Sequence, residues 1–250
     1  MKTLRKYIYT PIALLLSVTA LVSCHNDMPK PESKEGVFAV ILNVEDIKTE
    51  VETRASLEGI DISTFCVYLT DTKGNYWLEE VTYGSLTEKD CILPIGEDYN
   101  IYIESCSETD ATELNDGFGI YRFVGETVFD VEAGKTTPVS VNCSMANAGV
   151  KFEFEESFTN KFPIHAVTTL DSRSLVFKKD NQENVAYYNM DDETKEVEIS
   201  LSGSSGGWDD RLNVTRNVTL QKGKVIVVKL TYNEASGVRV LNDERLALSD

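Results

Sequence analysis

Residues 212–232 read LNVTRNVTLQKGKVIVVKLTY, and this stretch decides the class of fold. Apolar residues alternate with polar ones on both sides of Lys222-Gly223. Alternation with a period of two is typical of a strand with one buried face, and a short glycine turn between two such runs is typical of a hairpin. We therefore predict two antiparallel strands that pair with each other.

The rest of the chain repeats this pattern in short runs divided by turn signals. Gly125 is expected to interrupt one of these strands, and helical periodicity is nearly absent, with at most one turn of helix over residues 191–195. Many short strands at this spacing indicate an all-β sandwich. The further runs lie at residues 38–44, 65–69, 76–78, 91–95, 99–103, 121–123, 128–129, 139–143, 150–154 and 197–201.

A small polar joint at residues 144–149 divides the strands into two groups. We predict two tandem antiparallel β-sandwich domains, with a boundary near residue 146. The N-terminal domain spans residues 36–145 and the C-terminal domain residues 146–250.

The N-terminus has the features of a lipoprotein signal peptide over residues 1–23. Three basic residues precede an apolar run at 8–22, and residues 21–24 read LVSC, a lipobox that ends in Cys24. An uncleaved anchor helix is the alternative, but the run is shorter than the about 20 residues that span a bilayer. We expect Cys24 to carry a lipid that holds the protein at a membrane, with residues 24–35 as a tether.

The chain is acidic, with a formal net charge of −17. Removing residues 1–23 removes Lys2, Arg5 and Lys6 and no acidic residue, so the charge becomes −20. Such a charge argues against nucleic acid and anionic lipid surfaces as partners.

Four cysteines remain besides Cys24, namely Cys66, Cys91, Cys106 and Cys143. Their spacing is not that of a metal site, and four cysteines in an exported protein allow three disulfide pairings. Small buried residues within strands are the other reading, and the sequence leaves both open.

The residues argue against an enzyme. The chain has only two histidines, His25 and His165, and His165 fits a strand residue with a satisfied ring. Residues 203–207 match G-x-S-x-G, but no histidine and no helix follow, so a flexible hairpin loop is the better reading. We predict no catalytic residue, cofactor or metal site.

Two tryptophans could bind a glycan. Trp208 and Asp209 adjoin a flexible glycine loop, and Trp77 follows a turn. An exposed indole can stack on a sugar ring while nearby acids accept its hydroxyl hydrogens. Packing of Trp208 over the end of a sandwich is the alternative.

Arg54 lies in a polar stretch between the first and second strands, where a protease could cut an exposed loop. The cut would free residues 24–54, including the first strand. A sandwich that loses a strand keeps an open groove, which a strand from a neighbour can fill. An ordinary loop arginine is the alternative.

Several motifs in order make residues 1–155 resemble fimbrillin-like surface lipoproteins of Bacteroidetes, and more closely an uncharacterised lipoprotein domain family of Bacteroides. The resemblance implies transthyretin-like sandwiches, an outer-membrane anchor facing the cell surface, and a role in pili or adhesion, with Arg54 at the maturation position. Anchor-type members stay uncut. The motifs are the lipobox, Gly36-Val37-Phe38, Thr53-Arg54-Ala55, the strand 65–71 with Gly74, Leu93-Pro94-x-Gly96 with Tyr99, and Val139-x-Val141-x-Cys143 before Ala146-Asn147-Ala148.

We therefore predict a non-enzymatic outer-membrane lipoprotein that serves as a pilus subunit or pilus anchor and exchanges strands with other subunits. The alternative is a surface lipoprotein that binds a glycan, or another host ligand, for a polysaccharide-uptake system.

Overall fold

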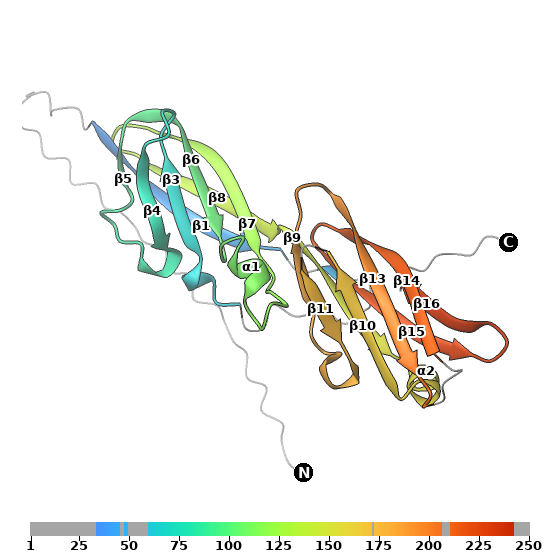
Figure 1. The fold of residues 1–250 in the computed structure, drawn as a ribbon. Coiled ribbons are helices and arrows are strands. Elements are labelled where there is room, and N and C mark those ends of the chain that lie inside the picture. The colour runs from blue at the N-terminus through green and yellow to red at the C-terminus, as the bar shows by residue number, and fades with distance from the viewer. Residues whose placement is uncertain (1–33, 46–47, 50–59, 172, 207–210, 243–250) are drawn as a thin grey trace, which may run out of the picture. The chain divides into compact units, whose positions relative to one another are not determined.

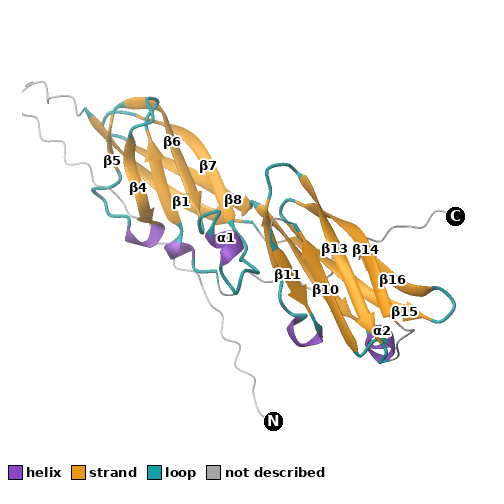
Figure 2. Cartoon of the chain, in the orientation of Figure 1, coloured by secondary structure: helices purple, strands orange, loops and turns teal. Residues whose placement is uncertain are grey.

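A computed structural model describes residues 34–45, 48–49, 60–171, 173–206 and 211–242. Strands dominate this part of the chain, and its helices are single short turns (Figure 2). The all-β prediction is confirmed.

The first half of the described chain forms a seven-stranded sheet in the order β4-β3-β6-β7-β8-β1-β5 (Figure 1). Its strands alternate between buried and exposed residues, as a sheet with one apolar face requires. The bounds are β1 Glu35–Val44, β3 Cys66–Thr70, β4 Tyr76–Thr82, β5 Ile92–Pro94, β6 Gly96–Glu104, β7 Phe123–Val131 and β8 Thr136–Met145.

This sheet folds over on itself between β7 and β8. The two strands pair only at Phe123 with Met145 and at Val124 with Ser144. Beyond that point β8, β1 and β5 face the other four strands across a shared core, where the rings of Phe38 and Phe129 lie 5.4 Å apart. The fold-over therefore buries both apolar faces in one cluster.

The second half of the described chain forms two further sheets. One has the order β11-β10-β13-β14, and the other has the order β12-β9-β15-β16 with β2 also paired to β15. Both sheets contribute to a second apolar cluster. The bounds are β2 Lys48–Thr49, β9 Asn147–Phe154, β10 Ile164–Leu170, β11 Ser174–Phe177, β12 Ala186–Asn189, β13 Thr194–Ser204, β14 Arg211–Gln221, β15 Lys224–Asn233 and β16 Gly237–Asn242.

The hairpin predicted over residues 212–232 is wrong, although both of its strands exist. β14 and β15 belong to different sheets, and β14 pairs instead with β13. The turn between them is held by other parts of the chain, because Lys222 N donates to Glu193 O and Gly223 N donates to Asn147 O. The chain therefore crosses from one sheet to the other at Lys222-Gly223.

Most strand pairs are antiparallel, as predicted, but the sheets also contain parallel pairs. β1 runs parallel to β8, and β15 runs parallel to β9. In both cases the partners are distant in sequence, so no tight turn forces them to run in opposite directions.

Gly125 does not interrupt a strand, as was predicted, but lies inside β7. A Cβ atom there would lie 2.5 Å from the carbonyl oxygen of Asn142, so glycine allows β8 to approach closely. Residues 191–193 form a bend, not the expected helical turn. The short helices are α1 (Asp110–Glu113) and α2 (Glu156–Lys161), with 3-10 turns η1 (Ile62–Thr64), η2 (Tyr83–Ser85) and η3 (Lys179–Asn181).

The domain boundary predicted near residue 146 stays a prediction. β8 ends at Met145 and β9 begins at Asn147, so one residue separates strands of different sheets. Polar and ring contacts also join the two halves, including a hydrogen bond from Tyr187 N to Phe118 O.

Candidate functional site

Most of the predicted site residues lie outside the part of the chain that the structure describes. These are Cys24, Arg54, Trp208 and Asp209. Trp77 is described, near the start of the edge strand β4, where 45% of its surface is exposed and its ring meets Tyr99 edge-on at 6.5 Å. The structure therefore tests the exposure of Trp77 but not the roles of the other four.

The strand β1 is the described element on which the strand-exchange prediction depends. It lies between β8 and β5, and pairs with β8 over the eight residues from Val37 to Val44. Its inward side chains are the predicted ones, because Phe38 and Leu42 are buried in the core while Ile41 is exposed. β1 thus fills a position in the sheet whose core side is apolar and whose edge presents the backbone hydrogen-bonding groups of β8. We call this position the β1 site.

The other edge of β1 has a much shorter partner. β5 pairs with β1 only from Glu35 to Val37, and the hydroxyl of Tyr83 donates to Val40 O further along. Contact with β8 is therefore the main backbone interaction that holds β1 among the described residues.

The cysteines other than Cys24 form no disulfide. Cys143 is fully buried in β8, and burial raises the pKa of its thiol to about 11. Cys66, Cys91 and Cys106 are partly exposed, and burial also raises the pKa of each thiol. Protonated thiols are poor nucleophiles and poor metal ligands, so the interpretation as small packed residues fits them.

His165 lies in β10, as predicted, and its ring is only half satisfied. Nδ1 lies 2.7 Å from Phe162 O, Nε2 has no hydrogen-bond partner, and the rings of Phe154 and Phe158 pack against it. Within the described ranges no group of three or more His, Cys, Asp or Glu side chains could hold a metal ion.

A cleft of about 430 Å³ opens where β8 ends and the β14–β15 crossing begins. Its lining carries charges of both signs and contains neither a histidine nor a cysteine. The lining residues are Glu45, Ser144, Met145, Glu193, Lys222, Gly223 and Lys224.

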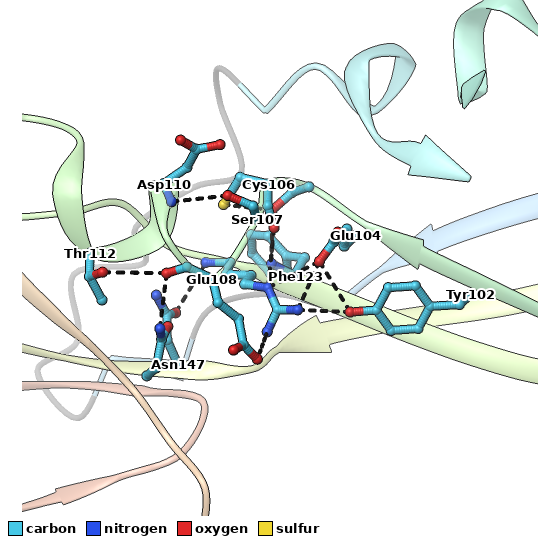
Figure 3. A network of polar contacts seen from close by, with 12 residues as sticks. Tyr102, Glu104, Cys106, Ser107, Glu108, Asp110, Thr112, Phe123 and Asn147 are labelled. Atoms are coloured by element: carbon cyan, nitrogen blue, oxygen red, sulfur yellow. Dashed lines mark hydrogen bonds and ion pairs between the residues drawn. The ribbon is translucent and has the colours of Figure 1, made fainter. Parts of the chain in front are cut away.

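A polar network that sequence reasoning missed is centred on Arg122, just before β7. Its guanidinium lies 2.8 Å from Glu104 Oε2, and the two side chains are only 12% and 13% exposed. Figure 3 shows Glu104 beside Tyr102, whose hydroxyl donates to Glu104 Oε2 and accepts from Arg122. Tyr68 on β3 donates to the second carboxylate oxygen, Oε1.

This network keeps both phenols protonated. Burial and the Glu104 charge raise the pKa of Tyr68 to about 12, and burial raises the pKa of Tyr102 to about 12 as well. The alternation of Tyr102 and Glu104 along one strand could have placed them on one face from the sequence alone.

Asn147 explains one motif of the family resemblance. It is 1% exposed, accepts a hydrogen bond from Arg122 N at 3.1 Å and donates to Ile120 O at 2.8 Å. A buried amide with these partners fixes the segment before β7 against the start of β9.

The chain belongs to the family described as "Domain of unknown function (DUF4493)", whose model matches residues 34–240. This confirms the resemblance to an uncharacterised domain family. No protein of curated function matches the chain. No helix of the described residues is long and apolar enough to cross a membrane.

The chain is also similar to solved structures of Bacteroidetes proteins. One is a fimbrial assembly protein from Parabacteroides distasonis, with 12% identity, a TM-score of 0.47, and coverage of 84% of this chain and 98% of that one. A candidate cell adhesion protein from Bacteroides eggerthii has 11% identity, a TM-score of 0.45, and coverage of 87% and 97%. The fimbrial anchor protein from Porphyromonas gingivalis has 13% identity, a TM-score of 0.39, and coverage of 82% and 95%.

Proposed function

We propose that the protein is a non-enzymatic lipoprotein of the outer membrane, anchored through Cys24, that serves as a structural component of a fimbria or adhesin at the cell surface. In this proposal its strands form two tandem transthyretin-like sandwich domains, residues 36–145 and 146–250. The observation that carries the proposal is the position of β1 between β8 and β5.

The contacts that β1 makes in the β1 site support exchange of this strand with a neighbouring subunit. Phe38 and Leu42 are the buried side chains of β1, and each contributes about 1.5–3 kcal/mol by burial. Departure of β1 would expose the apolar surface of the β1 site and the backbone edge of β8. A strand of similar pattern from another copy would cover both. A cut at Arg54 would allow β1 to leave.

An uncut chain gives the second form of the same proposal. With Arg54 intact, β1 stays in the β1 site and Cys24 holds the complete mature chain on the membrane. An anchor for other pilus subunits requires both.

The test is limited digestion of the folded, lipid-free protein by an Arg-specific protease. We expect the first cut at Arg54, and a labelled peptide of residues 35–44 should then exchange into the cut protein and not into the uncut one. Arg54→Gln is the matched control and should abolish both results. If Arg54 resists the protease, or if the cut protein takes up no peptide, the polymerising form is wrong.

The lipid anchor needs its own measurement. Cys24→Ala should abolish acyl labelling in cells and release the protein from the membrane fraction. Persistent acyl labelling of this variant would contradict the anchor.

The alternative function is glycan binding for a polysaccharide-uptake system, and the exposure of Trp77 favours it. Trp77→Ala and Trp208→Ala would separately test the two predicted platforms, by retention on polysaccharide gels. Unchanged retention of both variants would remove the tryptophans from this role.

A further inference from the structure

The outer face of the strands β4, β3, β6 and β7 carries three tyrosines, Tyr68, Tyr76 and Tyr102. On β3, Val67 and Leu69 point into the core, so Tyr68 points outward, and the same alternation places Tyr102 outward on β6. We call this surface the tyrosine face. It comprises Tyr68, Thr70, Tyr76, Asn100, Tyr102, Glu126 and Val128.

The strand register brings these residues into two neighbouring rows. In one row Tyr68 lies opposite Tyr102, which lies opposite Glu126, and the two rings are 5.8 Å apart. In the other row Thr70 pairs with Tyr76 on one side and with Asn100 on the other, and Val128 follows. Four strands at their usual spacing span about 14 Å, which is room for two or three sugar rings.

The tyrosine rings are fixed in place before any ligand arrives. Glu104 accepts from both hydroxyls, at 3.2 Å from Tyr68 and 3.1 Å from Tyr102, and Arg122 forms an ion pair with the same carboxylate at 2.8 Å. Because these side chains are already ordered, a ligand that stacks on the rings loses little affinity to side-chain entropy.

One further observation concerns the backbone beside this face. Close to the first row, Glu80 adopts a left-handed backbone with φ 54°, next to a register shift between β3 and β4. Strain and bulges of this kind often serve to re-aim a side chain at a functional surface.

The chemistry of the face fits a neutral carbohydrate. Flat rings and an apolar side chain can contact the C–H faces of sugars, while an exposed carboxylate, here that of Glu126, accepts hydroxyl hydrogens. Tyr76 is 58% exposed and Val128 is 56% exposed, so both are open to a large ligand. The net charge of −17 works against an anionic polysaccharide.

We propose that the tyrosine face binds a neutral glycan chain, with Tyr68, Tyr76 and Tyr102 as the stacking platform and the exposed carboxylate of Glu126 as a hydrogen-bond acceptor. This deepens the proposed adhesive role by naming a ligand class and a surface. It does not depend on cleavage at Arg54, so failure of strand exchange leaves it standing.

The experiment is affinity gel electrophoresis of the complete mature chain in gels that contain a neutral β-glucan, a neutral α-mannan or anionic polygalacturonate. We expect at least one neutral polysaccharide to retard the protein and polygalacturonate to have no effect. Tyr76→Ala and Tyr68→Ala should each weaken binding at least tenfold, as loss of a central aromatic contact usually does.

Two variants separate stacking from other effects. Tyr68→Phe keeps the ring and should retain most of the affinity, which a general loss of folding would not allow. Ile41→Ala changes an exposed apolar residue on β1, outside the tyrosine face, and should leave binding unchanged. Thermal melting confirms that each variant is folded.

The proposal is overturned if no neutral polysaccharide retards the wild-type protein. It is also overturned if Trp77→Ala abolishes binding while Tyr76→Ala and Tyr68→Ala do not. Retention only by polygalacturonate would assign the face to a charged ligand and would refute the argument from net charge.

Discussion

Replacing Phe38 by alanine tests whether β1 is held chiefly by its inward side chains. Phe38 is 1% exposed and packs against Phe129 at 5.4 Å between ring centroids. Truncation of such a ring costs about 3–5 kcal/mol, out of a total stability of about 5–15 kcal/mol for a typical protein. Ile41 is the matched control, because it lies on the same strand, pairs with the same neighbour and is 51% exposed.

The assay is thermal and urea unfolding of Phe38→Ala and Ile41→Ala beside the wild type. For a chain of this size each kcal/mol shifts the midpoint temperature by about 2–4 °C, so Phe38→Ala should lower it by roughly 6–20 °C. Ile41→Ala should change stability by no more than about 0.5 kcal/mol.

The same side chain should decide the affinity of a free β1 peptide. In the protein cut at Arg54, a peptide of residues 35–44 with Phe38→Ala should bind on the order of 10²–10³-fold more weakly than the natural peptide. If Phe38→Ala and Ile41→Ala behave alike in both assays, burial of Phe38 in the core does not hold β1 in the β1 site.

Three further predictions concern the network and the sheet. Arg122→Met leaves Glu104 buried without its partner and should cost about 3–5 kcal/mol in urea unfolding, while adding Glu104→Gln should recover part of this loss. Gly125→Val places a Cβ atom 2.5 Å from a backbone carbonyl oxygen and should cost about 1–3 kcal/mol, seen as a lower unfolding midpoint. The pKa values of Tyr68 and Tyr102 are about 12 in the folded protein, above the ordinary value of 10, so the unfolded chain loses these protons at lower pH. The protonated phenols therefore contribute their full free energy of folding below about pH 10, and this contribution is lost as the pH rises from about 10 to about 12. Tyrosinate absorbance should rise at higher pH in the folded protein than in the unfolded chain. Tyr68→Phe should remove part of the pH dependence of the free energy of unfolding, and an unchanged pH profile would contradict this assignment.

The sequence predicted strands well because alternation is a local signal. Phe38 and Leu42 read as inward-facing from their spacing alone, and both are buried. Alternation does not name the partner strand, however. β14 and β15 have the pattern of a hairpin, yet the turn at Lys222-Gly223 is bound by Glu193 and Asn147, which lie far away in sequence or in another strand.

The candidate sites were harder to predict for the same reason. Tyr68, Tyr102 and Arg122 come from three separate segments, and only the register of β3 with β6 brings the rings together. Gly125 reads as a strand breaker from its type, but the close approach of β8 gives it a place within the strand. A contact that depends on pairing between distant segments leaves no local pattern to read.

The parallel ladder between β1 and β8 also determines how the molecule bears mechanical load. In the proposed anchored form, Cys24 lies ahead of β1 in the chain, so tension on its lipid would enter the body through Glu35, the first residue of β1. A pull along the strand axis loads all eight residue pairs from Val37 to Val44 in shear, so they must yield together and not one after another. In that proposed form, the strand that a single cut at Arg54 would release is the one that would carry the tension while the chain is intact.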